Sequence, residues 1–413
     1  MEFIVEEIVR NIQLIKEYSK NNFKKCFRQA KGLLKYSYLV PGAVYDELWD
    51  WDSWLSGIAI NKIAEGEQQD IFEYEKGCVL NFLSMQDEEG RIPINATEKY
   101  RDSLFNLSEK QTNIHKPCLV QHALFICKKN EEYDWIRSGL EGFERFIKWY
   151  DDNCFHEKSG MYYWIDDFAI GVDNDPCTFF RPKNSCVSIL LNCLMYDELK
   201  ALSKLFEVFN IEEKAEWYLE KARRLKTAIN ESCWDEKDGF YYSVDINFMP
   251  VDANEKLHSG APLSYNNLIM RIGVWSGFMA LWSKIASKDQ AERIVKENYL
   301  DEKTFNSPNG VRSLSKLEKM YQIKATGNPS CWLGPIWLNV NYFVFKGLLN
   351  YGYVELAKEL AKKIVNLLGK DLANCGEYHE YYNPETGEGV NNQGFQSWNM
   401  LGYNIAVWLE ENL

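Results

Sequence analysis

Apolar residues recur along most of the chain at intervals of three and four positions, which places them on one face of an α-helix. This pattern predicts about twelve helices, at residues 3–19, 54–66, 70–86, 116–129, 133–151, 184–207, 211–230, 267–287, 288–298, 335–351, 353–369 and 394–411. Twelve consecutive helices make six helical hairpins. Because no segment rich in Ser, Pro or Gly separates them, the pattern favours one chain-wide toroid of paired helices, a single domain over residues 1–413, over two independent domains.

Short segments between the predicted helix pairs share a composition. Each places a turn-forming Asp, Glu, Asn or Gly beside aromatic residues, and these segments are 86–95, 155–166, 234–245 and 380–389. Such segments are typical of loops or small hairpins. Any one of them could equally be a helix connection capped for stability. Together they predict aromatic rings presented at one end of the toroid.

Composition adds a ligand preference to this picture. Aromatic residues make up 15% of the chain, more than packing alone requires, which suggests a surface for stacking. The net charge of −13 disfavours binding to nucleic acid or to an anionic membrane. A neutral polar ligand is therefore expected.

The cysteines and the N-terminal residues indicate in which cell compartment the protein is expected. The eleven Cys residues are scattered without a CxxC or paired pattern, which indicates free, buried thiols in a reducing compartment, the cytoplasm. Glu2, Glu6 and Glu7 interrupt the apolar residues of the first eighteen positions. We therefore expect a first helix there and not a signal peptide.

Several catalytic classes lack their motifs. The histidines, at positions 115, 122, 156, 258 and 379, show no metal-ligand spacing, so no catalytic transition metal is expected. The chain also has no GxSxG nucleophile motif and no GxxxxGK[ST] phosphate-binding loop. Carboxylic acids remain as the candidates.

The first acid cluster is YDELWDWDSW at 45–54, where Asp50 and Asp52 alternate with tryptophans. Alternating rings and carboxylates can stack on the apolar face of a sugar and accept hydrogen bonds from its hydroxyls. The alternative is an ordinary helix start capped by Asp52 or Ser53. The number of aromatic residues favours the sugar site.

The second cluster, WIDDFAIGVDNDPCTFFRP at 164–182, contains Gly and Pro and cannot be a continuous helix. Crowding and burial in such a loop can raise the pKa of one carboxyl, as a general acid requires. Calcium binding is the rival use, although the spacing is not that of an EF-hand. The residues alone leave four candidates open, which are Asp166, Asp167, Asp173 and Asp175.

Two later segments are further candidates for the functional site. In GNPSCWLGPIWLNVNYF (327–343), Pro335 is expected in the first turn of a helix with Trp332 and Trp337 beside it. A helix-packing interface would explain these tryptophans equally well. In the segment 375–401 the competing acids are Glu377, Glu380, Glu385 and Glu388.

Taken in order, WDWDSW, GVDNDP, CWLGPIWLNVNY and HEYYNPETGEG followed by QSW resemble the motif series of the trehalase-like (α/α)6 glycoside hydrolases. This group includes glycoside hydrolase family 63 and the compact mannosylglycerate and glucosylglycerate hydrolases. The resemblance runs from about residue 45 to residue 400. It implies an all-α (α/α)6 barrel with short β-hairpins in its loops.

The resemblance also implies roles for individual residues. Asp173 of GVDNDP falls on the general acid and Glu380 of HEYYNP on the general base. Trp51, Asp52 and Ser53 fall on the motif that holds the sugar. Tyr381 and Tyr382 would lie beside the base and close over the substrate. The other residues expected to bind substrate are Trp49, Gln121, Arg181, Trp332, Trp337 and Trp398.

The implied reaction inverts the anomeric configuration, with the two carboxyl groups about 6.5–9.5 Å apart. The expected substrate is a small α-glucoside or α-mannoside, such as a disaccharide or glycosylglycerate, with no cofactor; a homo-oligomer is left open. Leu333 stands where relatives often have Arg, so a cation is missing there or is supplied by Arg181. A sugar epimerase or isomerase and a non-catalytic carbohydrate-binding toroid are the alternatives.

Overall fold

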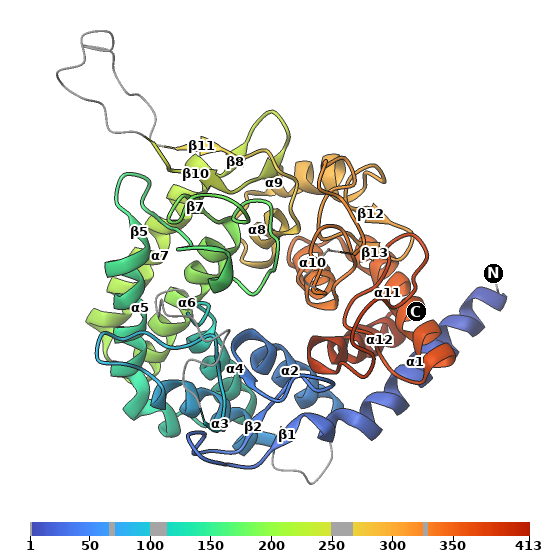
Figure 1. Ribbon diagram of the computed structural model, residues 1–413, viewed down its shortest axis with the longest axis horizontal. Coiled ribbons are helices and arrows are strands. Elements are labelled where there is room, and N and C mark those ends of the chain that lie inside the picture. Colours follow the sequence, from blue (N-terminus) through green and yellow to red (C-terminus); the bar gives the residue numbers. More distant parts are fainter. Residues whose placement is uncertain (1, 66–70, 100–113, 249–266, 325–328) are drawn as a thin grey trace.

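The computed structural model describes residues 2–65, 71–99, 114–248, 267–324 and 329–413. Its α-helices follow one another around a ring (Figure 1). They are α1 (Glu2–Asn22), α2 (Asp50–Ile63), α3 (Ile71–Ser84), α4 (Leu119–Asn130), α5 (Leu140–Cys154), α6 (Ile189–Val208), α7 (Glu212–Ser232), α8 (Met279–Trp282), α9 (Lys288–Arg293), α10 (Leu338–Asn350), α11 (Val354–Cys375) and α12 (Leu401–Glu411). Predicted positions 66, 70, 327 and 328 lie outside the described residues.

The even-numbered helices form an inner ring. Each of them contacts the next, from α2 through α4, α6, α8 and α10 to α12, and α12 contacts α2 and closes the circle. The odd-numbered helices lie outside, where α7 packs on α6 and α11 packs on α10 and α12. The predicted all-α toroid of helical hairpins is confirmed.

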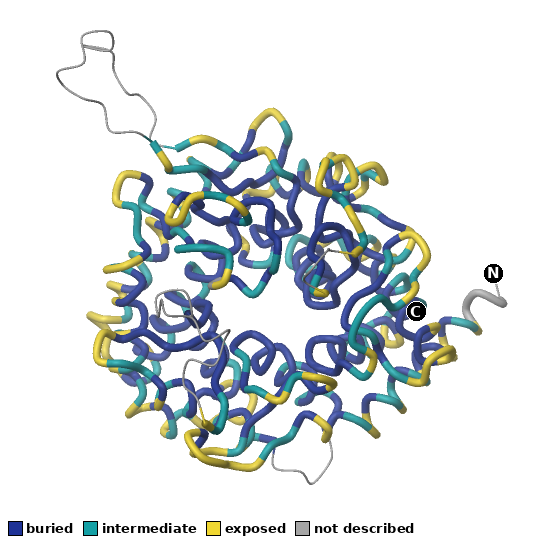
Figure 2. Tube along the Cα trace, viewed as in Figure 1, coloured by how far each residue is buried: buried dark blue, intermediate teal, exposed yellow. Residues whose placement is uncertain are grey.

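Burial separates the two rings of helices (Figure 2). Helix α2 is buried on nearly all sides, as expected of a helix inside a large core. Helix α7 buries one stripe only, made of Tyr218, Ala222, Leu225 and Ile229 at helical spacing, and carries its charges on the opposite face. The inner helices can therefore hold side chains rigidly at the ends of the ring.

The strands are two residues long and pair antiparallel. They are β1 (Phe27–Arg28), β2 (Tyr38–Leu39), β3 (Leu48–Trp49), β4 (Asn95–Ala96), β5 (Phe155–His156), β6 (Met161–Tyr162), β7 (Cys186–Val187), β8 (Trp234–Asp235), β9 (Phe240–Tyr241), β10 (Val244–Asp245), β11 (Leu268–Ile269), β12 (Asn306–Ser307) and β13 (Gly310–Val311). The predicted segments 155–166 and 234–245 contain the hairpins β5–β6 and β8–β9. The segment 86–95 is instead a turn that leads into β4, which pairs with β3.

One predicted helix is largely wrong. The range 267–287 contains β11, a short 3-10 helix at Trp275–Phe278 and the four-residue α8. Its first residues are extended because β11 pairs with β10. Lys284 adopts a left-handed conformation, with φ of 57°, and this conformation ends the helix.

Four inner helices begin later than predicted. Helices α4, α6, α10 and α12 start at 119, 189, 338 and 401, where the periodicity suggested 116, 184, 335 and 394. Pro335 precedes α10 and is not in its first turn, because Ile336 pairs with Tyr382 in an extended conformation. Residues before α4, α10 and α12 line the site described below.

All eleven cysteines are free, and Cys375 is the only exposed one. Within the described parts of the chain, no helix has the length and apolar character needed to cross a membrane.

Candidate active site

A cavity of about 760 Å³ lies at the N-terminal end of the inner helical ring. Its walls come from the residues that precede or begin α2, α4, α10 and α12 and from the loop before α6. The fold thus gathers segments far apart in the sequence at one place. The predicted residues that line this cavity are Trp49, Trp51, Asp52, Asp173, Trp332, Trp337, Glu380 and Trp398.

Glu380 is buried and held by three donors. The Tyr45 hydroxyl donates to Oε1 at 3.2 Å, and the amides of Asn391 and Asn392 donate to Oε2 at 3.0 and 2.5 Å. Burial raises the pKa of Glu380 to about 7, the donors oppose this shift, and the charge of Asp173 adds to it. Glu380 can therefore gain or lose a proton near neutral pH.

The segment that carries Glu380 is fixed to its neighbours. The Glu380 backbone N–H donates to the Asn391 carbonyl at 2.8 Å, and Tyr382 pairs with both Ile336 and Gly389. These contacts hold the segment as an irregular hairpin against the strand-like residues before α10. Glu380 thereby faces the cavity from a rigid support.

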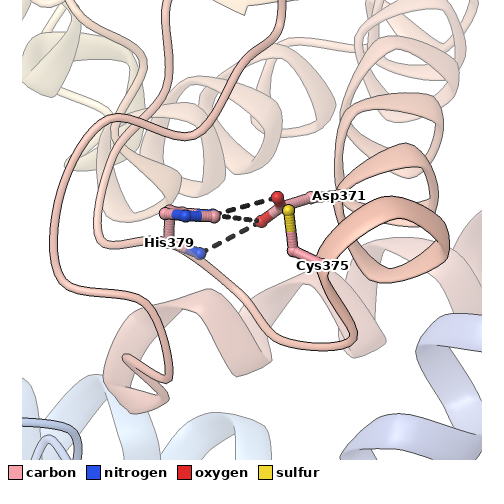
Figure 3. Close-up of side chains that lie close together, drawn as sticks. All are labelled: Asp371, Cys375 and His379. Carbon is pink, nitrogen blue, oxygen red and sulfur yellow. Dashed lines mark hydrogen bonds and ion pairs between the residues drawn. The ribbon is translucent and has the colours of Figure 1, made fainter.

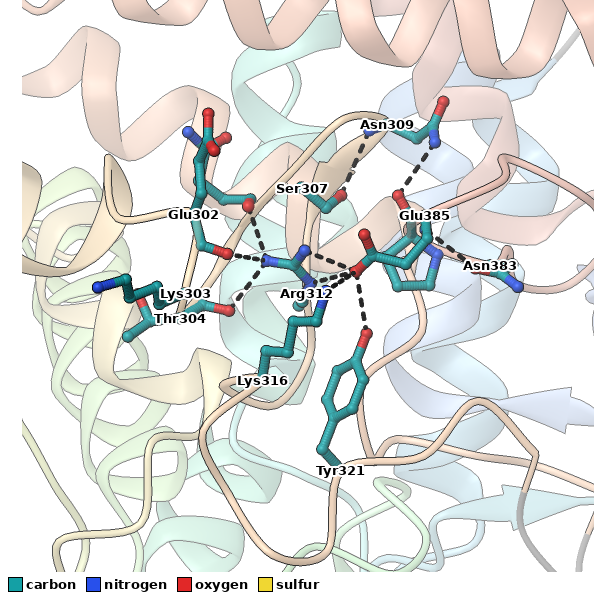
Figure 4. Close-up of polar contacts among 12 residues, drawn as sticks. Glu302, Lys303, Thr304, Ser307, Asn309, Arg312, Lys316, Tyr321, Asn383 and Glu385 are labelled. Atoms are coloured by element: carbon teal, nitrogen blue, oxygen red, sulfur yellow. Dashed lines mark hydrogen bonds and ion pairs between the residues drawn. The ribbon is translucent and has the colours of Figure 1, made fainter.

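A buried arginine anchors the tip of this hairpin (Figure 4). Arg312 donates from Nη2 to Glu385 Oε1 at 2.6 Å, and from Nη1 to the carbonyls of Glu302, Thr304 and Asn306 at 3.0, 3.1 and 2.7 Å. Glu385, one of the four competing acids, is thus engaged in this anchor and does not line the cavity.

Asp173 is the acid of the 164–182 cluster that lines the cavity. Asp167 accepts from the Thr178 hydroxyl at 2.8 Å, and Asp175 accepts from the Cys177 backbone N–H at 2.8 Å. Burial raises the pKa of Asp167 to about 7 and that of Asp175 to about 6. A raised pKa therefore does not distinguish among these acids, whereas Asp173 differs from Asp167 and Asp175 in lining the cavity.

The neighbouring Asn174 sets the position of the Asp173 loop. Its side-chain amide donates to the Ser330 carbonyl at 2.9 Å and accepts from the Trp332 backbone N–H at 3.1 Å. Asn174 has φ of 59°, a left-handed conformation that Asn adopts more readily than most residues. The loop before α6 is thus tied to the tryptophan segment before α10.

Four tryptophans form one wall of the cavity. Trp332 stacks on Trp337 with ring centroids 3.9 Å apart, and Trp51 stacks on Trp332 at 5.9 Å. Trp398 contacts Trp51 edge-on at 5.6 Å. Such a wall suits the apolar face of a sugar ring.

Asp52 does not cap α2, the alternative considered for it. The helix begins at Asp50, whose carboxylate accepts from the Trp51 backbone N–H at 2.7 Å, and Ser53 donates to the Asp50 carbonyl. Asp52 instead accepts from the Ser397 hydroxyl at 2.7 Å on the cavity wall. Burial raises the pKa of Asp52 to about 7.

Lys116 is a cavity residue that sequence analysis missed. Its Nζ lies 2.8 Å from Asp50 Oδ1, and both side chains are fully buried. The same Nζ sits 4.6 Å from the centroid of the Trp51 ring, a cation–π contact. Gly171, with φ of 63°, leaves room for the ammonium, since a Cβ there would come within 2.9 Å of Nζ.

We expect Lys116→Met to lower the free energy of unfolding by about 3–5 kcal/mol, because Asp50 would remain buried without its cation. Chemical denaturation followed by tryptophan fluorescence measures this loss. Lys16→Met is the matched control, since the partly exposed pair of Lys16 with Glu410 should contribute about 0–1 kcal/mol. Equal losses in the two variants would contradict a stabilising role for the buried pair.

Four expected substrate-binding residues do not line this cavity. Gln121 lines a different cavity, where it donates to the carbonyls of Pro117 and Leu194. Arg181 pairs with Asp245, so it does not replace the cation missing at Leu333.

The other two are the tyrosines beside Glu380, which support the site from behind. The Tyr381 hydroxyl donates to the Pro329 carbonyl at 2.5 Å and its ring packs on Trp337, while the Tyr382 hydroxyl donates to Asp371 at 3.0 Å. Both rings are buried, so they brace the cavity and are not placed to close over a ligand.

Known proteins resemble this chain in sequence and in fold. Residues 45–398 match the family described as the mannosylglycerate hydrolase MGH1-like glycoside hydrolase domain. Over 214 residues the chain is 27% identical to a mannosylglycerate hydrolase from Rubrobacter radiotolerans, a match that covers 51% of this chain and 41% of that protein. The first three curated relatives are matched over 54, 41 and 33% of their own lengths, so the match spans about half of each relative or less.

Solved structures share the fold. A glycoside hydrolase family 63 mannosylglycerate hydrolase from Thermus thermophilus, solved in complex with Tris, is similar with a TM-score of 0.67 at 17% identity, covering 92% of this chain and 97% of that chain. Neutral trehalase from Saccharomyces cerevisiae gives a TM-score of 0.63 at 16% identity, covering 91% and 73%. These likenesses confirm the (α/α)6 barrel.

Proposed function

Because this chain belongs to the mannosylglycerate hydrolase MGH1-like glycoside hydrolase family, we propose that it is an inverting, exo-acting hydrolase of a small α-glucoside or α-mannoside. The observation that carries the proposal is the meeting of Asp173 and Glu380 in one tryptophan-walled cavity. Two carboxyl groups that flank a bound sugar are what glycoside hydrolysis requires.

Glu380 is proposed as the general base. In an inverting reaction the base removes a proton from water while the water attacks the anomeric carbon. A pKa of about 7 gives this carboxylate more basicity than an ordinary glutamate, yet leaves a large ionised fraction at neutral pH. Tyr45, Asn391 and Asn392 orient its two oxygens and stabilise the ionised form.

Asp173 is proposed as the general acid. It would protonate the glycosidic oxygen from the opposite face of the sugar as the bond to the leaving group breaks. The tie from Asn174 to Ser330 and Trp332 holds its loop against the tryptophan wall on which the sugar would stack. The leaving group then departs as an alcohol without a metal ion or organic cofactor.

Asp52 is proposed to bind the hydroxyls of the sugar. The Asp52 carboxyl retains acceptor capacity beyond its bond from Ser397. Lys116 lines the cavity but its side chain is fully buried, so its ammonium, paired with the Asp50 carboxylate and placed over the Trp51 ring, is proposed to hold that ring in position. Trp51 and Trp332 would pack against the apolar face of the sugar ring.

The substrate is tested by a panel of small α-glucosides and α-mannosides that includes disaccharides and glycosylglycerates. We expect release of glucose or mannose from at least one of them, and no release from the β-linked counterparts. Catalysis of epimerisation or isomerisation, or binding of these sugars without turnover, would instead support the two alternative functions. None of the described residues that line the cavity is a His, which favours the carboxylate pair.

The raised pKa of Glu380 predicts a pH dependence. Since the base must be ionised, kcat/KM should fall about tenfold per pH unit below about pH 7. Asn392→Ala removes a donor that stabilises the carboxylate, so it should raise the pKa of Glu380. The acid limb of the pH profile, where kcat/KM falls, should then move to higher pH. Gln393→Ala, an exposed amide at the next position, should leave the limb in place. If the acid limb of the kcat/KM profile moved equally in both variants, the ionisation that it reports would not be that of Glu380.

We further propose that residues 1–413 act as one catalytic domain in the cytoplasm. The closed ring of helices supports the first point, and eleven free thiols, ten of them buried, support a reducing compartment.

A further inference from the structure

Three potential metal ligands converge outside the active-site cavity. They are Asp371 and Cys375 on α11 and His379 in the segment that follows it (Figure 3). One ligand atom from each residue lies within 4.8 Å of the other two. None of the three lines the cavity of Asp173 and Glu380.

The local fold explains this convergence. Asp371 and Cys375 are four residues apart, so their side chains lie on the same face of the last turns of α11. Gly376 follows in a left-handed conformation, with φ of 73°, and ends the helix. The chain then turns back, and the His379 backbone N–H donates to Asp371 Oδ2 at 3.1 Å.

We propose that Asp371, Cys375 and His379 form a binding site for a single zinc ion. Carboxylate oxygen, thiolate sulfur and imidazole nitrogen are the three donor types that zinc uses, and three protein ligands leave a fourth position for water. Cys375 is exposed, so an ion can enter from solvent. Ca²⁺ and Mg²⁺, which prefer oxygen ligands, fit this donor set poorly.

The hydrogen bonds around Asp371 hold its carboxylate in a position to coordinate a metal ion. Oδ2 of Asp371 accepts from the Tyr382 hydroxyl at 3.0 Å and from the His379 backbone N–H at 3.1 Å. His379 Nδ1 lies 2.9 Å from Oδ1 and 3.1 Å from Oδ2, and the Cys375 thiol also hydrogen-bonds to this carboxyl group. Outer donors that fix one carboxylate oxygen while the other binds the ion are typical of metal sites.

Zinc would replace the contact between the imidazole and Oδ1. The imidazole binds the ion through Nδ1 and carries its proton on Nε2, the Cys375 thiol releases its proton to solvent, and no oxidation or reduction takes place. Because the ion joins the end of α11 to the segment before Glu380, binding should raise the melting temperature. The site does not depend on the proposed glycosidase activity.

Cobalt binding tests the ligand set in the full-length protein after treatment with a chelator. We expect one equivalent of Co²⁺ to produce a thiolate-to-cobalt charge-transfer band and visible bands of four-coordinate intensity, and one equivalent of Zn²⁺ to abolish both. Cys375→Ser should remove the charge-transfer band and weaken Zn²⁺ binding about tenfold or more. Glu377→Gln, which removes a nearby carboxylate outside the set, should bind as the wild type does.

Alkylation provides a second readout that needs no variant. Cys375 is the one exposed thiol, so iodoacetamide should modify it first, and equimolar Zn²⁺ should protect it, as peptide mass spectrometry can show. The proposal is overturned if Zn²⁺ gives no protection, if Co²⁺ gives no thiolate band, or if Cys375→Ser retains that band. Hydrolysis of α-glycosides by the chelator-treated protein would leave the proposed function standing whichever result is found.

Discussion

Asp173→Asn is expected to lower kcat/KM for an unactivated α-glycoside by about 10²–10⁴-fold, because the leaving alcohol would no longer receive a proton in the transition state. Asparagine is close in size to aspartate, and the loop remains tied by Asn174 to Ser330 and Trp332. The loss should therefore appear in the chemical step and not in folding. Steady-state kinetics on the wild type and the variant, with circular dichroism as a folding check, measure it.

Leaving-group chemistry makes this prediction specific for an acid. An α-glycosyl fluoride needs little protonation to depart, so Asp173→Asn should retain much more of the wild-type rate on the fluoride than on an alkyl glycoside. Asp167→Asn is the matched control, because Asp167 belongs to the same loop but bonds to Thr178. If Asp167→Asn suffers the larger loss, the assignment of the acid to Asp173 is wrong.

Glu380→Gln is expected to cause a loss of similar size, about 10²–10⁴-fold in kcat, because the amide cannot take a proton from the attacking water. The glycosyl fluoride should not rescue this variant, since its defect lies with water and not with the leaving group. Glu388→Gln, an exposed glutamate on the same hairpin, serves as control and should keep its activity. Rescue of Glu380→Gln by the fluoride would contradict the role of base.

Glu380→Gln should be more stable than the wild type at pH values where Glu380 is ionised, because the variant buries no charge at this position. Burial raises the pKa of Glu380 from 4.5 to about 7, so the folded protein holds the proton more tightly than the unfolded chain does. This stability is fully present below pH 4.5 and is lost as the pH rises through about 7, at a cost of about 3 kcal/mol. Glu380→Gln should thus unfold at a higher denaturant concentration than the wild type at pH 8, and the two should converge at pH 4.

Sequence periodicity predicted the fold well where helices bury a single stripe or run for several turns. Helix α7 shows both the stripe and its charged face, and its predicted range, 211–230, nearly matches Glu212–Ser232. Periodicity failed over 267–287 because apolar residues there lie in the extended β11 and in the four-residue α8, and such short segments cannot be separated from a longer helix by periodicity. It also placed the starts of α4, α6, α10 and α12 too early and that of α2 too late, since α2 already begins at Asp50.

The candidate site was only partly predictable. The tryptophans and Asp52 carried a local signal, since alternating rings and acids are unusual. The acids in 164–182 were indistinguishable by sequence, and only the fold shows which of them faces the cavity. Lys116 gave no signal, because its partner Asp50 is 66 residues away along the chain.

The donors around Glu380 illustrate the same limit. Tyr45 stands at the edge of the first acid cluster and Asn391 and Asn392 follow the late motif, but nothing in the sequence indicates that the three converge on one carboxylate. Conversely, Tyr381 and Tyr382 neighbour Glu380 in sequence but do not line the cavity, because their hydroxyls bond to Pro329 and Asp371 and their rings are buried in packing.

The central claim is that Asp173 and Glu380 act from opposite faces of the sugar, and the configuration of the first product tests it most directly. Proton NMR during the first turnovers of an α-linked substrate resolves the two anomers before they equilibrate. Inversion predicts that the β-anomer of the released sugar appears first and then mutarotates. First appearance of the α-anomer would show retention, which would contradict the assignment of Glu380 as a base that activates water.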